Sequence, residues 1–144
     1  MNDTHSTHGT GNAVTAVADA YFGAWQANQP SQLADVLAPD VRVNGPLGQI
    51  DGAAQYQASL ARIFAITSEL VFHKRWVDGD DVMTWFDLHP RGAGEPFPVA
   101  SWLQIEGGRI TRVRVTFDLG KLLQAGDPRR ASTGQEEPGP AARP

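Results

Sequence analysis

The hydrophobic positions of the chain change their period at Thr67, from a helical repeat to the alternation of a strand. Before this point, apolar side chains recur every three or four residues over 13–28, which predicts an amphipathic helix capped by Asn12. A second, short helix stops before Pro39, and a third begins after Asp51, which we expect to cap it. The stripes of the three helices are Val14, Val17, Tyr21 and Trp25; Leu33, Val36 and Leu37; and Tyr56, Leu60, Ile63 and Phe64.

Strands are expected between and after these helices. Residues 41–43 alternate as a short strand, and residues 44–48 are expected to form a turn. After Thr67, turn signals at 78–81 and 106–108 join four longer strands into two hairpins. The four strands cover 69–77, 82–89, 97–105 and 109–118. Helices that precede a run of hairpins predict an α+β fold, with the helices packed on one face of a curved sheet.

The later strands carry large apolar side chains on both faces. In the strand at 82–89, one face presents Phe86 and Leu88, while the other presents Met83 and Trp85. A sheet with one solvated face shows a cleaner alternation, so each face here needs a cover. The helices cover one face, and a second copy of the chain is the simplest cover for the other. The pattern therefore predicts a homodimer.

Both ends of the chain lack the side chains that a packed core requires. Residues 1–12 are polar, and alanine is the only apolar side chain in residues 127–144 apart from proline. Such segments bury too little surface to offset the entropy lost on ordering. We therefore expect a single domain at 13–126 between two disordered tails at 1–12 and 127–144.

Composition and charge narrow the classes of function. Hydrophobic residues make up 41% of the 144 residues, which suffices for a core, and a net charge of −4 argues against nucleic acid or an anionic membrane as partner. The chain has no cysteine, which excludes disulfides and thiolate chemistry and fits a cytoplasmic location. No apolar run reaches the roughly 18 residues of a membrane span, and residues 1–12 are unlike a secretory signal.

Three polar side chains are candidates for chemistry. Asp87 and His89 are two residues apart, so they share one face of their strand. If this face lines a cavity, the carboxylate can orient the imidazole, or each group can act as an acid or base; otherwise both are simply hydrated. Tyr21 lies in an apolar stripe, either as a core side chain or as a neutral phenol that donates to a carbonyl oxygen gaining charge.

Five segments carry a family resemblance that spans the expected domain. They are AVADAY at 16–21, LAPDVRV at 37–43, GPLG at 45–48, EGGRI at 106–110 and VRVTF at 113–117. These segments resemble the nuclear transport factor 2-like superfamily, and within it the branch of ketosteroid isomerases and SnoaL-like polyketide cyclases. The resemblance implies a cone-shaped, cystatin-like α+β fold with three helices on a strongly curved mixed or antiparallel sheet. This scaffold hosts isomerases, cyclases, hydrolases, dehydratases and non-enzymatic binders.

The resemblance also bears on the catalytic groups. Tyr21 falls where the isomerases keep a phenol that hydrogen-bonds a developing enolate. The two aspartates of the isomerases are absent, since their positions correspond to Gly45 and, with a one-residue gap, to Ser101. The arginine between two aspartates of the limonene-epoxide-hydrolase relatives is not evident either. Ordinary steroid-type isomerisation is therefore not expected.

The same correspondence with the family implies a cavity lined mainly by aromatic and aliphatic side chains. It points Asp87 and His89 into the cone beside Trp85, so that Tyr21, Asp87 and His89 are the expected catalytic residues. The expected substrate-binding residues are Trp25, Leu37, Asn44, Leu60, Phe64, Trp85, Ser101, Leu103, Val113 and Phe117. Such a lining suits a large apolar ligand that is held by shape and oriented by a few hydrogen bonds.

The leading hypothesis is a cyclase or related tailoring enzyme of secondary metabolism. It would fold a polyketide-like apolar intermediate into one reactive conformation. One version of this hypothesis is a cycloaddition, which needs little acid–base help. One alternative is a double-bond isomerase or dehydratase with a relocated base, and another is a non-catalytic domain that binds apolar ligands. No metal, flavin or nicotinamide motif is present, so we expect neither cofactor nor metal. The segment at 90–98 is either a hairpin connection or a mobile lid.

Overall fold

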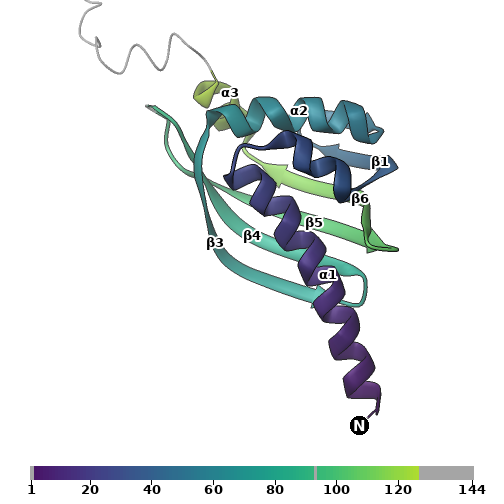
Figure 1. The fold of residues 1–144 in the computed structure, drawn as a ribbon. Coiled ribbons are helices and arrows are strands. Elements are labelled where there is room, and N and C mark those ends of the chain that lie inside the picture. The colour runs from purple at the N-terminus through teal and green to yellow at the C-terminus, as the bar shows by residue number, and fades with distance from the viewer. Residues whose placement is uncertain (1, 93, 127–144) are drawn as a thin grey trace, which may run out of the picture.

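A six-stranded sheet curves around two helices and forms the centre of the fold (Figure 1). The computed structural model describes residues 2–92 and 94–126. Its elements are α1 (Asn2–Gln26), the 3₁₀ helix η1 (Pro30–Asp35), β1 (Leu37–Gly45), β2 (Gly48–Asp51), α2 (Ala53–Ile66), β3 (Thr67–Asp78), β4 (Asp81–Pro90), β5 (Phe97–Glu106), β6 (Arg109–Phe117) and α3 (Leu119–Ala125). The strands follow the order β2-β1-β6-β5-β4-β3. The predicted α+β class, with helices gathered before a run of hairpins, is confirmed.

The sheet is mixed and open. The β1–β6 pair is parallel, and the other neighbouring strands pair antiparallel. The strands β2 and β3 form its two edges. The four long strands follow the predicted segments closely, because their alternation and their turn signals are local properties of the sequence.

An aromatic cluster joins α1 and α2 to the inner face of the sheet. Trp25 of α1 stacks on Phe64 of α2 at a centroid distance of 5.5 Å. Phe22 of α1 meets Phe86 of β4 edge-on at 5.3 Å. The rings lie on the sides of the helices that face the sheet, as the apolar stripes predicted, and their burial holds the helices in place.

The start of α1 differs from the prediction. The helix begins at Asn2, so Asn12, predicted to cap it, lies within it. The predicted disordered tail at 1–12 stays a prediction. A helix that is already nucleated extends by one hydrogen bond per residue, which offsets the weak helix propensity of Gly9 and Gly11. These first turns extend beyond the sheet in Figure 1. The predicted tail at 127–144 lies outside the described residues, so the domain limits stay a prediction.

Three further local predictions were wrong. The expected second helix is a 3₁₀ helix that ends at Asp35, so Leu37 opens β1 instead of closing a helical stripe. The expected turn at 44–48 shortens to two residues, and the chain returns as β2. Asp51 therefore ends a strand, and Gly52 precedes α2 without a side-chain cap.

The helix α3 was not expected from the sequence. The carboxylate of Asp118 caps it, since the backbone N–H of Lys121 donates to Asp118 Oδ1 at 3.1 Å. A helix of seven residues shows barely two turns of periodicity, which is too little to separate it from the end of a strand. In the described part of the chain, none of the helices combines the length and the apolar character that crossing a membrane requires.

Candidate functional site

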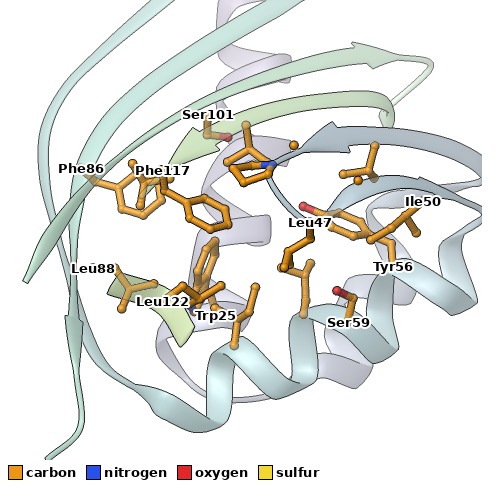
Figure 2. Close-up of a pocket in the computed structure, with 18 of the residues that line it drawn as sticks. Trp25, Leu47, Ile50, Tyr56, Ser59, Phe86, Leu88, Ser101, Phe117 and Leu122 are labelled. Atoms are coloured by element: carbon orange, nitrogen blue, oxygen red, sulfur yellow. The ribbon is translucent and has the colours of Figure 1, made fainter. Parts of the chain in front are cut away.

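A narrow pocket lies between α1, α2 and the inner face of the sheet (Figure 2). Its volume is about 40 Å³. Side chains from both helices and from β1, β2, β4, β5 and β6 form its walls, and α3 adds Leu122. Most of the lining is aliphatic or aromatic.

Two phenols form the polar centre of this pocket. Tyr21 of α1 and Tyr56 of α2 line it, and their hydroxyl oxygens lie 2.5 Å apart in a hydrogen bond. Each tyrosine belongs to the apolar stripe of its helix, so helix packing brings the two stripes and the two hydroxyls together. The mutual bond uses one phenolic proton, which leaves the other for an acceptor in the pocket.

Burial keeps both phenols protonated. It raises the pKa of Tyr21 well above the usual value, and the adjacent Tyr56 raises that pKa further. Burial also raises the pKa of Tyr56 to about 12, although the hydrogen bond with Tyr21 acts in the opposite direction. At neutral pH the pair is therefore a neutral hydrogen-bond donor.

This protonation state is open to a direct test, because the chain contains only two tyrosines. An unfolded chain ionises them near pH 10, whereas the native pair is expected to stay protonated until about pH 12. A raised native pKa stabilises the fold fully below about pH 10, and this contribution is lost as the pH rises toward 12. Near-ultraviolet absorbance should show little tyrosinate in the native protein at about pH 11 and roughly 90% ionisation in urea. Equal titration curves in the two states would contradict the buried pair.

Trp25 presents an apolar surface to the pocket because its polar atom is satisfied elsewhere. Its Nε1–H donates to Thr67 Oγ1 at 3.2 Å, and the Thr67 hydroxyl donates to the carbonyl of Ile63 at 2.7 Å. The indole also stacks on Phe64. This chain of contacts fixes the orientation of the ring, which therefore serves as a rigid apolar wall.

The remaining polar groups of the pocket are weak acids and bases. Ser59 of α2 and Ser101 of β5 contribute hydroxyls to the lining (Figure 2). None of the described residues that line the pocket is an Asp, Glu, His, Lys or Arg. Among the side chains that the structure describes, in residues 13–92 and 94–126, no three Asp, Glu or His groups lie close enough to share a metal ion. The pocket can donate hydrogen bonds, but it holds no strong general base.

The predicted orientation of β4 was wrong. The strand turns Thr84, Phe86 and Leu88 inward, so Asp87 and His89 lie on the outer face of the sheet. The inward face is the one without a charged side chain, whose burial would require a partner. Because side chains along a strand alternate between its two faces, a difference of one residue moves Trp85, Asp87 and His89 together out of the pocket.

Asp87 therefore has a different partner. Its Oδ2 lies 2.9 Å from His73 Nε2 of β3, and both side chains are partly exposed. Trp85, expected to contact substrate, is 45% exposed on the same outer face. Asn44 also faces outward, where its side-chain oxygen accepts a hydrogen bond from Arg112.

The other expected residues divide into two groups. Those that line the pocket with Tyr21 are Trp25, Leu60, Ser101 and Phe117. Those that are buried in the core without lining it are Leu37, Phe64, Leu103 and Val113. Tyr56, Leu47 and Phe86 also line the pocket, and none of them was predicted as a site residue from the sequence. For Tyr56 a signal existed, since it is the second of only two tyrosines and also interrupts an apolar helical stripe.

The segment that follows β4 contacts α3. Lys121 Nζ of α3 lies 3.1 Å from Glu95 Oε1, and Phe97, where β5 begins, lines the pocket. This ion pair joins two exposed side chains and contributes little to stability. Whether the segment opens as a lid stays a prediction.

Comparison with known proteins identifies the fold. A model of the SnoaL-like domain matches residues 18–113. No curated protein matches the sequence significantly. Several solved structures share the architecture at low sequence identity, and three of them differ in their named activities.

A SnoaL-like polyketide cyclase candidate from Jannaschia sp. CCS1 is 18% identical, with a TM-score of 0.69 over 83% of this chain and 95% of its own. An LEH-like epoxide hydrolase from M. tuberculosis is 21% identical, with a TM-score of 0.68 over 88% and 97%. A steroid delta-isomerase from Pseudomonas aeruginosa is 19% identical, with a TM-score of 0.68 over 83% and 93%. At these identities the likeness shows the fold alone, so the chemistry has to be argued from the pocket.

Proposed function

Because the chain belongs to the SnoaL-like domain family, within the nuclear transport factor 2-like superfamily, we propose that it is a cyclase or related tailoring enzyme of secondary metabolism. Its ligand is an extended, polyketide-like apolar molecule that carries a carbonyl group. The observation that carries the proposal is the buried pair of neutral phenols, Tyr21 and Tyr56, in a pocket lined mainly by apolar side chains. The apolar wall selects one folded conformation of the ligand, and the phenols orient its carbonyl.

The proposed chemistry follows from what the pair can donate. One phenol donates to the other, and the remaining proton is donated to the carbonyl oxygen of the ligand. This bond withdraws electron density from a conjugated alkene and strengthens as the oxygen gains charge during ring closure. No proton needs to leave the ligand in a cycloaddition, which agrees with a pocket that lacks a strong base.

The relocated-base alternative has little support. An isomerase or dehydratase needs a base within hydrogen-bond reach of the carbon that loses its proton. The candidates Asp87 and His89 lie on the outer face of the sheet, away from the pocket. Among the described lining residues, the phenols are the titratable groups, and both are neutral.

A non-catalytic binding domain is the second candidate, and the size of the pocket favours it. The cavity of about 40 Å³ is far below the roughly 300–1,000 Å³ of pockets that hold drug-sized ligands. An enzyme that folds a long ligand into a reactive conformation requires this cavity to widen. A protein that binds small apolar molecules requires less widening.

Ring closure of a linear trienone with a terminal alkene tests the two functions. The cyclase is expected to accelerate this intramolecular cycloaddition above the uncatalysed rate and to favour one stereoisomer, as measured by chiral chromatography. Heat-unfolded protein provides the baseline. Binding of the trienone without any acceleration would support the binding domain and contradict the cyclase.

The outer face of the sheet supports the predicted homodimer, which we also propose. Trp76 is 50% exposed there, and Met83 and Trp85 are exposed beside it. Arg114 of β6 lies over the ring of Trp102 at 4.5 Å, on the same face as Asp87 of β4. A two-fold axis along β5, which lies between β4 and β6, would place the basic β6 of one copy over the acidic β4 of the other, so the surface would be complementary to itself.

Replacing Trp85 with glutamate should therefore convert the dimer into a monomer. The change puts a charge in the middle of the apolar face and is expected to weaken association at least about tenfold. Analytical ultracentrifugation over a range of concentrations measures this effect. Leu123→Glu on α3 alters an exposed leucine away from the sheet and should leave the dimer intact. A wild-type protein that stays monomeric at the highest concentration would contradict the proposal.

A further inference from the structure

The mouth of the pocket carries an apolar side chain in an unusual position. Leu47 lies in the two-residue turn between β1 and β2, where it lines the pocket while 46% exposed. Figure 2 shows it among the lining side chains, near Tyr56. Of the large apolar residues that the structure describes as exposed, Leu47 alone also lines this pocket. Its side chain therefore lies at the boundary between the cavity and the solvent.

The turn that carries Leu47 is anchored on one side and unconstrained on the other. A Cβ at Gly45 would lie 2.8 Å from Val115 Cγ1 and 3.0 Å from the Val115 carbonyl oxygen, so this end of β1 packs tightly against β6. On the other side, Gly48 has a φ of +104° and no atom near its missing side chain. The turn is thus held at a fixed point of the sheet, with open space at its far end.

The strand that follows the turn adds few restraints. β2 is an edge strand that pairs with β1, and most of its residues are exposed. Segments with few buried contacts move at low free-energy cost. The other walls of the pocket include Phe86, Leu88 and Phe97, which are fully buried core residues. Displacing Leu47 therefore widens the cavity at a lower free-energy cost than displacing one of these buried side chains.

We infer that Leu47 determines ligand size in this pocket by occupying its mouth and leaving when an extended apolar ketone enters. The inference rests on the proposed function, because it concerns the same pocket and the same ligand class. The apolar contacts of Leu47 compete with those of the ligand, so the apparent affinity equals the intrinsic affinity multiplied by the fraction of molecules in which the mouth is open. A shorter side chain removes this competition.

Prodan, a neutral naphthalene dye with a propionyl ketone, is the probe for this effect, since its emission reports an apolar environment. Leu47→Ala is expected to lower the Kd for prodan about tenfold, and Leu47→Trp is expected to raise it by a similar factor. Acetophenone, a smaller ketone that needs less opening, should change by less than about threefold when measured as a competitor of prodan. The quantity compared between the variants is the ratio of the Kd for prodan to the Kd for acetophenone.

A matched control separates this effect from a general loss of apolar surface. Leu123→Ala shortens another exposed leucine, on α3, that does not line the pocket, and should leave both affinities unchanged. If the wild type and Leu47→Ala bind prodan equally well, Leu47 does not control ligand size, and the proposed function is unaffected. If neither binds either ketone, both the inference and the proposed function are overturned. If Leu47→Ala gains affinity while the wild type fails to accelerate ring closure, the inference stands and the cyclase fails.

Discussion

Replacing Tyr21 and Tyr56 together with phenylalanine is expected to slow ring closure about a hundredfold, which is typical of losing a donor to an oxygen that gains charge. Each single replacement is expected to cost less than about tenfold. The reason is the bond between the two hydroxyls, because removing one hydroxyl frees the other from its partner. The remaining phenol keeps its proton and can donate it to the ligand. The measurement is kcat/KM of the wild type, both single variants and the double variant on one trienone.

The loss of activity is expected to come from losing the hydrogen-bond donor to the ligand. Deleting a buried hydroxyl elsewhere should not cause it. Thr84→Val removes a buried hydroxyl from the inner face of β4 outside the pocket, and it should retain full activity. Because both phenols stay neutral, the wild-type rate should be independent of pH from about 6 to 9. A rate that titrates in this range would indicate a general base and would contradict a mechanism based on neutral donors. Equal losses in the two single variants and the double variant would show that the pair acts as one unit.

The fold could be predicted from the sequence because its signals are local and repeated. Period-2 alternation and glycine-rich turns located the four long strands, and helical spacing placed Tyr21 and Trp25 on the buried side of α1. The elements that were missed are short. β2 consists of four residues without a large apolar stripe, so its pairing with β1 is a tertiary contact that no local pattern encodes.

The pocket could be predicted only in part, because alternation gives two faces without saying which is inside. On β4 both faces carry large apolar side chains, and Trp85 made the wrong one plausible. The charge of Asp87 was the better guide, since a buried carboxylate needs a partner and the pocket offers none. The phenol pair depends on the packing of α1 against α2, so the sequence could place each tyrosine on a stripe without joining them.

Replacing Phe86 with alanine is expected to lower the free energy of unfolding by about 3–5 kcal/mol, the range typical of a buried phenylalanine. Phe86 is fully buried in β4, and its ring centroid lies 5.3 Å from that of Phe22 and 5.7 Å from that of Trp25. Truncation therefore removes contacts to α1 and leaves a void that a rigid sheet fills poorly. Urea unfolding followed by tryptophan fluorescence measures the change.

A neighbouring ring of the same cluster provides the control. Phe72 of β3 lies 5.5 Å from Phe86 but is 40% exposed, so Phe72→Ala removes less buried surface and should cost clearly less. Because Phe86 also lines the pocket, the void in Phe86→Ala joins the ligand cavity. An apolar ligand such as benzene should bind there and recover part of the lost stability, by an amount that rises with the logarithm of its concentration above the Kd. Equal losses in the two variants, with no recovery by benzene, would mean that the pocket and the core do not share this side chain.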